Sequence, residues 1–151
     1  MKSKTGKPAG AYLNVDLEVR SRSDLAVLVR ALSPALFNLH SGRVGGAHFA
    51  SFEAPDCGVP PDEAIRAMAK AVQALPRRAR AVWNRADDRV FDIGVEQARS
   101  AWPFALALER DTLVAMVEIG ARVAVTLYGL PSRRPKPPSR ALQRTALTRR
   151  R

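Results

Sequence analysis

The chain has 151 residues, 46% hydrophobic and 26% charged, a composition typical of a globular protein and not of a disordered one. This length allows one domain whose hydrophobic core is large enough to be stable without disulfides or bound metal ions. The single cysteine, Cys57, excludes an intrachain disulfide. No apolar segment follows the basic first ten residues, and the most apolar later stretch contains charges. We therefore expect a cytoplasmic protein with no membrane span.

The formal net charge of +11 lies at the two ends of the chain. Lys2, Lys4 and Lys7 precede residue 11, and the basic residues after Pro131 are Arg133, Arg134, Lys136, Arg140, Arg144, Arg149, Arg150 and Arg151. Neither end segment contains Asp or Glu, and the residues between them hold 14 Lys or Arg and 14 Asp or Glu, so that middle part is formally neutral. The sequence predicts a basic N-terminal tail over 1–10, a single α+β domain over 11–130, and a Pro/Arg-rich basic tail over 131–151 that is disordered.

The first expected element is a strand over residues 12–20, because apolar and polar side chains alternate strictly along it. A helix then begins near Ser23, which can cap it, and Pro34 interrupts it. The inward stripe of this helix comprises Leu25, Leu28, Val29 and Leu32. Beyond the proline, a further apolar turn is expected from Leu36, Phe37 and Leu39.

Residues 41–46, Ser-Gly-Arg-Val-Gly-Gly, are expected to form a loop before a second strand over 48–53. The loop has the composition of a phosphate cradle, but a phosphate loop follows a strand and opens a helix, which is the reverse of the order here. A flexible connection is the better interpretation.

Two helices follow, one beginning at Pro61 and one after Pro76, since proline favours the first turn of a helix. The first has Asp62 and Glu63 in its opening turn, where carboxylates are favourable. The expected inward residues of the two helices are Ile65, Met68, Ala69, Val72 and Leu75, and then Ala79, Val82, Trp83 and Ala86.

Alternation predicts further strands over 89–95 and 102–108, the latter at an edge or a strand's start because Pro103 lacks a ladder N–H. A last helix begins at Asp111 or Thr112 and ends at Gly120. It is expected to turn Leu113, Met116 and Val117 inward. The final strand, 122–128, carries Val123, Val125 and Leu127 on one face.

The predicted order is β-α-β-α-α-β-β-α-β. Each strand shows one bulky apolar face, which indicates that helices pack on one side only. The fold class expected is therefore α+β, a two-layer sandwich with a mixed five-stranded sheet and helices on one face.

No catalytic motif of the hydrolase, zinc protease, P-loop or dinucleotide type is present, and His40, His48 and Cys57 lack metal-ligand spacing. No catalytic residue, metal ligand or cofactor is assigned. Asp16 and Glu18 nevertheless share a strand face that Asp92 and His48 could join, so a carboxylate-based enzyme or metal site is one alternative. An ordinary half-exposed strand face is the other.

The second face of the predicted sheet combines small residues with carboxylates and tyrosines. Its candidate partner-binding residues are Tyr12, Asn14, Asp16, Glu18, Asp92, Ala107, Thr126 and Tyr128. Such a shallow platform suits a protein partner or peptide, and this is the leading functional hypothesis. A plain solvated face and a homodimer formed through an edge strand are the alternatives.

The basic tails support a second hypothesis, nonspecific association with nucleic acid. They contain no aromatic residue that could stack on bases, so a solubilising role is the alternative.

Two segments, Arg89-Val-Phe-Asp-Ile-Gly94 and Leu113 through Tyr128, give the stretch from Tyr12 to Tyr128 a loose resemblance to small bacterial α+β domain proteins. Some of these sit near toxin–immunity loci. The resemblance implies a noncatalytic, immunity-like protein-binding role and no catalytic residues.

Overall fold

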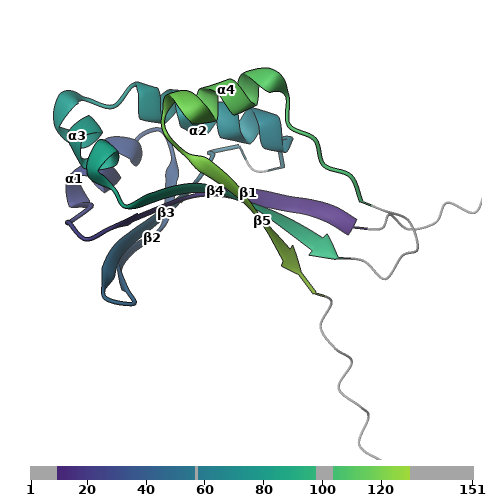
Figure 1. Ribbon diagram of the computed structural model, residues 1–151, viewed down its shortest axis with the longest axis horizontal. Coiled ribbons are helices and arrows are strands. Elements are labelled where there is room, and N and C mark those ends of the chain that lie inside the picture. Colours follow the sequence, from purple (N-terminus) through teal and green to yellow (C-terminus); the bar gives the residue numbers. More distant parts are fainter. Residues whose placement is uncertain (1–9, 57, 98–103, 130–151) are drawn as a thin grey trace, which may run out of the picture.

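The computed structural model describes residues 10–56, 58–97 and 104–129. A five-stranded mixed sheet forms one layer and four helices cover one of its faces, as Figure 1 shows. The predicted α+β two-layer fold is therefore confirmed. In chain order the elements are β1 (Gly10–Ser21), α1 (Ala26–Leu32), β2 (Phe37–Val44), β3 (Ala47–Glu53), α2 (Pro61–Gln73), α3 (Arg77–Arg85), β4 (Asp88–Gln97), α4 (Arg110–Glu118) and β5 (Arg122–Tyr128).

The strands lie in the order β2-β3-β1-β4-β5. β1 is central and runs antiparallel to both β3 and β4, while β4 and β5 are parallel. A parallel pair needs a crossover connection, and α4 lies in the one between β4 and β5. β2 and β5 are the edge strands of the described sheet.

The order of elements differs from the predicted one because residues 37–44 form strand β2 in place of an apolar turn and a loop. Gly45 and Gly46 have φ angles of 58° and 85°, and Val44 pairs with Ala47 across them. Two successive positive φ angles are the requirement of a tight hairpin turn whose twist matches that of the strands. The glycine-rich segment is therefore the end of a strand and its hairpin turn.

The strand predicted over 102–108 is also wrong where it can be compared. Trp102 and Pro103 lie outside the described residues, and residues 104–109 have no regular secondary structure. Leu106 and Leu108 still pack against the core. The alternation of apolar and small residues in this segment thus reflects burial of one side of it. The segment is not a strand of the sheet, because β5 is the strand that pairs with β4 on that side.

The core lies between the sheet and the helices. As predicted, α2 begins at Pro61 and α3 follows Pro76, and α1 ends at Leu32 before Pro34. The largest fully buried side chains include Leu17, Phe52, Ile65, Met68, Trp83, Phe91 and Ile93.

Helix α4 turns a different face inward from the one predicted. Thr112, Met116 and Ile119 are buried, whereas Leu113 is 45% and Val117 76% exposed. The helix packs beside α2, where Arg66 Nη1 lies 3.5 Å from Thr112 Oγ1. Because α4 packs in this way, Val123, Val125 and Leu127 of β5 are exposed, although they were expected in the core.

Trp83 connects α3 to the turn between α4 and β5. Its side chain is fully buried, and its indole Nε1 donates a hydrogen bond of 2.8 Å to the carbonyl oxygen of Ile119. Arg89 Nη1 in turn donates to the carbonyl oxygen of Trp83 at 3.0 Å. One residue therefore holds three segments together.

Replacing Trp83 by Phe should lower the free energy of unfolding by about 2–4 kcal/mol, since it opens a cavity and removes the hydrogen bond that the indole donates to the buried carbonyl oxygen of Ile119. Urea denaturation followed by circular dichroism measures this loss. Val27→Ala, at an exposed site on α1, is the control and should change stability by no more than about 0.5 kcal/mol. A Trp83→Phe loss below about 1 kcal/mol would contradict the assigned role.

Candidate functional site

The candidate site is the sheet face opposite the helices, which we call the open face. Asp16 on the central strand β1 is directly opposite Glu53 on β3 and Asp92 on β4. Paired residues on neighbouring strands point to the same side of a sheet, and Glu18 follows Asp16 at the same side. Asp16, Glu18, Glu53 and Asp92 together form what we call the acidic strip.

The carboxylates of the acidic strip repel one another in a partly desolvated place. Burial raises the pKa of Asp16 to about 6, with further upward contributions from Glu53, Glu18 and Asp92. Asn14 opposes this shift, because its Nδ2 donates a hydrogen bond of 2.8 Å to Asp16 Oδ1. The pKa of Glu18 is also raised, mainly by burial and then by Asp92. The strip therefore holds more negative charge than its surroundings stabilise.

A glycine on β4 shapes the floor of the site. A Cβ at Gly94 would lie 2.5 Å from Asn14 Oδ1 and 3.3 Å from Tyr128 Cε2, so only glycine lets both side chains cross this point. Nearby, Thr126 Oγ1 lies 2.8 and 2.9 Å from the two carboxylate oxygens of Asp92. The hydroxyl fixes Asp92 at the margin of the strip.

Six of the eight residues predicted for the partner-binding face lie together on the open face, namely Asn14, Asp16, Glu18, Asp92, Thr126 and Tyr128. Tyr12 does not, because β1 has a register shift between Tyr12 and Asn14. The extra residue reverses the side to which earlier side chains point, so Tyr12 sits opposite Val95 and packs against the core. Ala107 is exposed but belongs to no strand.

Glu53 is the main residue that the sequence analysis missed. It lies in the strand predicted over 48–53, and its place after the buried Phe52 could have assigned it to the outer face. Its position beside Asp16 depends on β3 pairing with β1, which no local pattern encodes.

The open face changes character toward the hairpin of β2 and β3. The Arg20 guanidinium lies 4.8 Å from the ring centroid of Phe49, and the His40 ring is 5.7 Å from the same ring. Phe37 is an exposed aromatic residue directly opposite Glu53. The acidic strip is therefore bordered by an aromatic region, which was not foreseen because β2 was not predicted as a strand.

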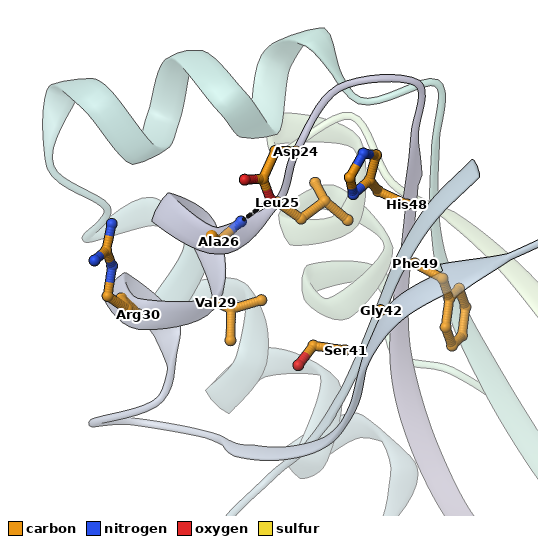
Figure 2. Close-up of a pocket in the computed structure, with 9 residues that line it drawn as sticks. All are labelled: Asp24, Leu25, Ala26, Val29, Arg30, Ser41, Gly42, His48 and Phe49. Carbon is orange, nitrogen blue, oxygen red and sulfur yellow. Dashed lines mark hydrogen bonds between the residues drawn. The ribbon is translucent and has the colours of Figure 1, made fainter. Parts of the chain in front are cut away.

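A separate pocket of about 360 Å³ lies between α1 and the β2–β3 hairpin. Figure 2 shows Leu25, which directly precedes α1, and Val29 of α1 pointing toward the hairpin, while Arg30 points away from it. Asp24 uses Oδ1 to accept a hydrogen bond of 2.8 Å from the N–H of Ala26. The charged side chains that line the pocket do not converge on a common point. The pocket is therefore a weaker candidate for a binding or catalytic site than the open face.

Within the described ranges, no three or more His, Cys, Asp or Glu side chains come close enough to hold a metal ion. No helix among these residues is long and apolar enough to cross a membrane. The basic tail residues Arg133 to Arg151 and Cys57 lie outside the described residues. Comparisons with protein-family models, curated proteins and solved structures find no match for this chain.

Replacing Asp16 by Asn should stabilise the domain at about pH 7.5 by about 1 kcal/mol, a value reduced because the side chain is half-exposed. An acid with a raised folded-state pKa binds its proton more tightly when folded. Its ionisation therefore removes stability as the pH rises from about 4 to about 6. Asn cannot ionise, so the gain should vanish near pH 4.

Thermal or urea unfolding at the two pH values measures this difference. Asp56→Asn removes an exposed loop carboxylate outside the acidic strip and should not reproduce the pH-dependent gain. A gain from Asp16→Asn that is equal at both pH values would show that the cost of ionising Asp16, by burial and by the neighbouring carboxylates, is not its cause.

Proposed function

We propose that this chain is a noncatalytic protein-binding domain that takes a basic segment of its partner on the open face. The observation that supports the proposal is the crowding of four carboxylates on a sheet face that no described element covers, with the pKa of Asp16 raised to about 6. An arginine or lysine placed between Asp16 and its neighbours would replace repulsion by attraction.

The geometry favours an extended basic segment over a compact ligand. The acidic strip spans three adjacent strands, β3, β1 and β4, with a spacing of about 4.8 Å between neighbours. Charged side chains of an extended chain laid across these strands could meet successive carboxylates. Partial burial of Asp16 reduces screening by water, so each such ion pair would gain more than one on a fully exposed surface.

The aromatic region gives the partner a second kind of contact. Phe37, His40 and Phe49 lie on the strands next to the strip and offer apolar area beside its charges. Interfaces combine aromatic contacts with a polar border in this way. A partner with apolar residues flanking its basic ones would fit both regions.

An immunity-like role in the bacterial cytoplasm is the more specific form of this proposal. It is supported only by the resemblance carried by residues 89–94 and 113–128. In that role the basic segment would belong to a toxin, and the domain would act by covering it.

Nucleic-acid association through the tails is the second hypothesis. The acidic strip would repel phosphates, so contacts with nucleic acid would fall to the tails or to α3, whose nine residues include four arginines and no carboxylate. Removing residues 1–10 and 131–151 should abolish such binding if the tails carry it. Binding to a DNA oligonucleotide that survives this truncation at high salt would refute a tail mechanism.

The main proposal predicts that the full chain binds a fluorescein-labelled peptide of alternating arginine and serine, and not one of glutamate and serine. The double variant Asp16→Asn/Glu18→Gln should bind the arginine peptide about tenfold more weakly in fluorescence polarisation. Binding should also weaken between about pH 7.5 and about pH 5.5, because Asp16 takes up a proton near pH 6.

The matched control is Glu63→Gln/Glu118→Gln, which removes the same charge from exposed sites in the helix layer. It should lower the affinity by less than about twofold. Equal losses in both double variants would indicate attraction to net charge alone and would refute a site on the open face, as would a complete lack of binding.

A further inference from the structure

Edge strand β5 of the described sheet carries an exposed apolar face on the helix side. Val123, Val125 and Leu127 are in register with the buried residues Phe91, Ile93 and Val95 of β4, which places them on the same side. They are nevertheless 41%, 56% and 63% exposed. A row of apolar side chains at a free sheet edge is an unusual surface for an isolated domain.

The other edge of the sheet differs in a way that makes β5 stand out. β2 has a register shift between Asn38 and His40, and such bulges discourage pairing with another strand. β5 has no register shift against β4, no proline, and no charged residue after Arg122. Nothing in β5 itself opposes the addition of a further strand.

The single charge of β5 is neutralised within the chain. Arg122 donates from Nε and Nη2 to the two carboxylate oxygens of Asp88, at 2.9 and 2.6 Å. A surface with no uncompensated charge can approach an identical surface without repulsion. This favours a second copy over a charged partner as the occupant of the edge.

We propose that the chain forms a homodimer in which β5 pairs antiparallel with β5 of a second copy, about a two-fold axis through Val125. The two sheets would join into one sheet of ten strands, with the helices of both copies on the same side. The apolar pairs of this interface lie on the helix side of the sheet, and its Ala124–Thr126 and Arg122–Tyr128 pairs lie at the margin of the open face. The acidic strip on β3, β1 and β4 is not part of it.

The sequence of β5 is self-complementary in this register. Val125 meets its own copy, Val123 meets Leu127, Ala124 meets Thr126, and Arg122 meets Tyr128. Every pair on the helix side is apolar, and Arg122 faces an aromatic ring on the other side. No like charges are brought together.

Geometry narrows the register further. If the helices of both copies lie on one side, the two-fold axis must pass through a residue, because paired side chains must point to the same face. An axis at Val125 is the one that pairs all seven residues of β5. An axis at a neighbouring residue such as Ala124 leaves Leu127 without a partner in the strand.

Helix α4, the element that precedes β5, also carries exposed apolar side chains. Leu113, Val114 and Val117 are exposed on the side of α4 away from the buried Thr112 and Met116. A stable interface takes about 800 Å² from each partner, more than a strand about 23 Å long supplies by backbone pairing alone. The outward residues of α4, which leads directly into β5 (Figure 1), offer further exposed apolar area.

The oligomeric state of the full chain tests the proposal. Sedimentation equilibrium should give twice the mass of one chain, and Val125→Lys should give a monomer with an unchanged circular dichroism spectrum. The matched control is Leu39→Lys, a similarly exposed apolar residue at the opposite edge, and it should stay dimeric. A monomeric parent chain, or loss of the dimer in the Leu39 variant alone, would overturn the proposal.

Disulfide trapping tests the register in a Cys57→Ser background. Facing residues in an antiparallel pair have Cα atoms about 4.5–5.5 Å apart, within the range of a disulfide. Val125→Cys should therefore cross-link two copies on oxidation. Leu127→Cys should not, because its two copies would lie about 13 Å apart along the strands. Equal cross-linking of the two variants, or none from Val125→Cys, would refute the two-fold axis at Val125.

Discussion

Val15, Leu17 and Val19 leave the central strand β1 on the helix side, and Asp16 and Glu18 leave it on the other. The apolar set is buried and fixes β1 in the middle of the sheet. The carboxylates of Asp16 and Glu18, which alternate with these apolar residues, are thereby held close to the carboxylates of β3 and β4. Hydrophobic burial is the dominant favourable term in folding, so it can hold like charges closer together than they would settle alone. The electrostatics of the open face therefore depend on packing on the opposite side.

The exposure of strand β5 also depends on packing, in this case on the packing of helix α4. Trp83 reaches from α3 to the carbonyl of Ile119, where α4 gives way to β5. α4 itself packs beside α2 and contacts it through side chains such as Gln73, whose Nε2 donates to Glu118 at 3.0 Å. The four described helices do not cover the five strands evenly, and they leave the apolar face of edge strand β5 exposed. The position of α4 thus decides which part of the sheet is free.

Local signals in the sequence predicted the features that depend on local physics. Pro61 and Pro76 marked helix starts, and the alternation along β1 and β5 marked strands, because proline geometry and a period of two need no knowledge of distant residues. Several of the failures concern distant partners. Leu113 and Val117 were assigned inward since α4 was expected on the sheet, and Glu53 was missed because pairing between β1 and β3 is not written in either strand. Tyr12 was misplaced by a single extra residue, which alternation alone cannot reveal.

The arginines of α3 lie in the helix layer, and the acidic strip lies on the opposite surface of the sheet. A body with opposite charges on its two sides has an electric dipole across its thickness and turns in the field of an approaching charged molecule. A cationic partner would therefore meet the sheet side first more often than chance allows. This orientation raises the rate of productive encounters at low ionic strength and fades as the Debye length shrinks, so added salt would slow association more than it would hasten release.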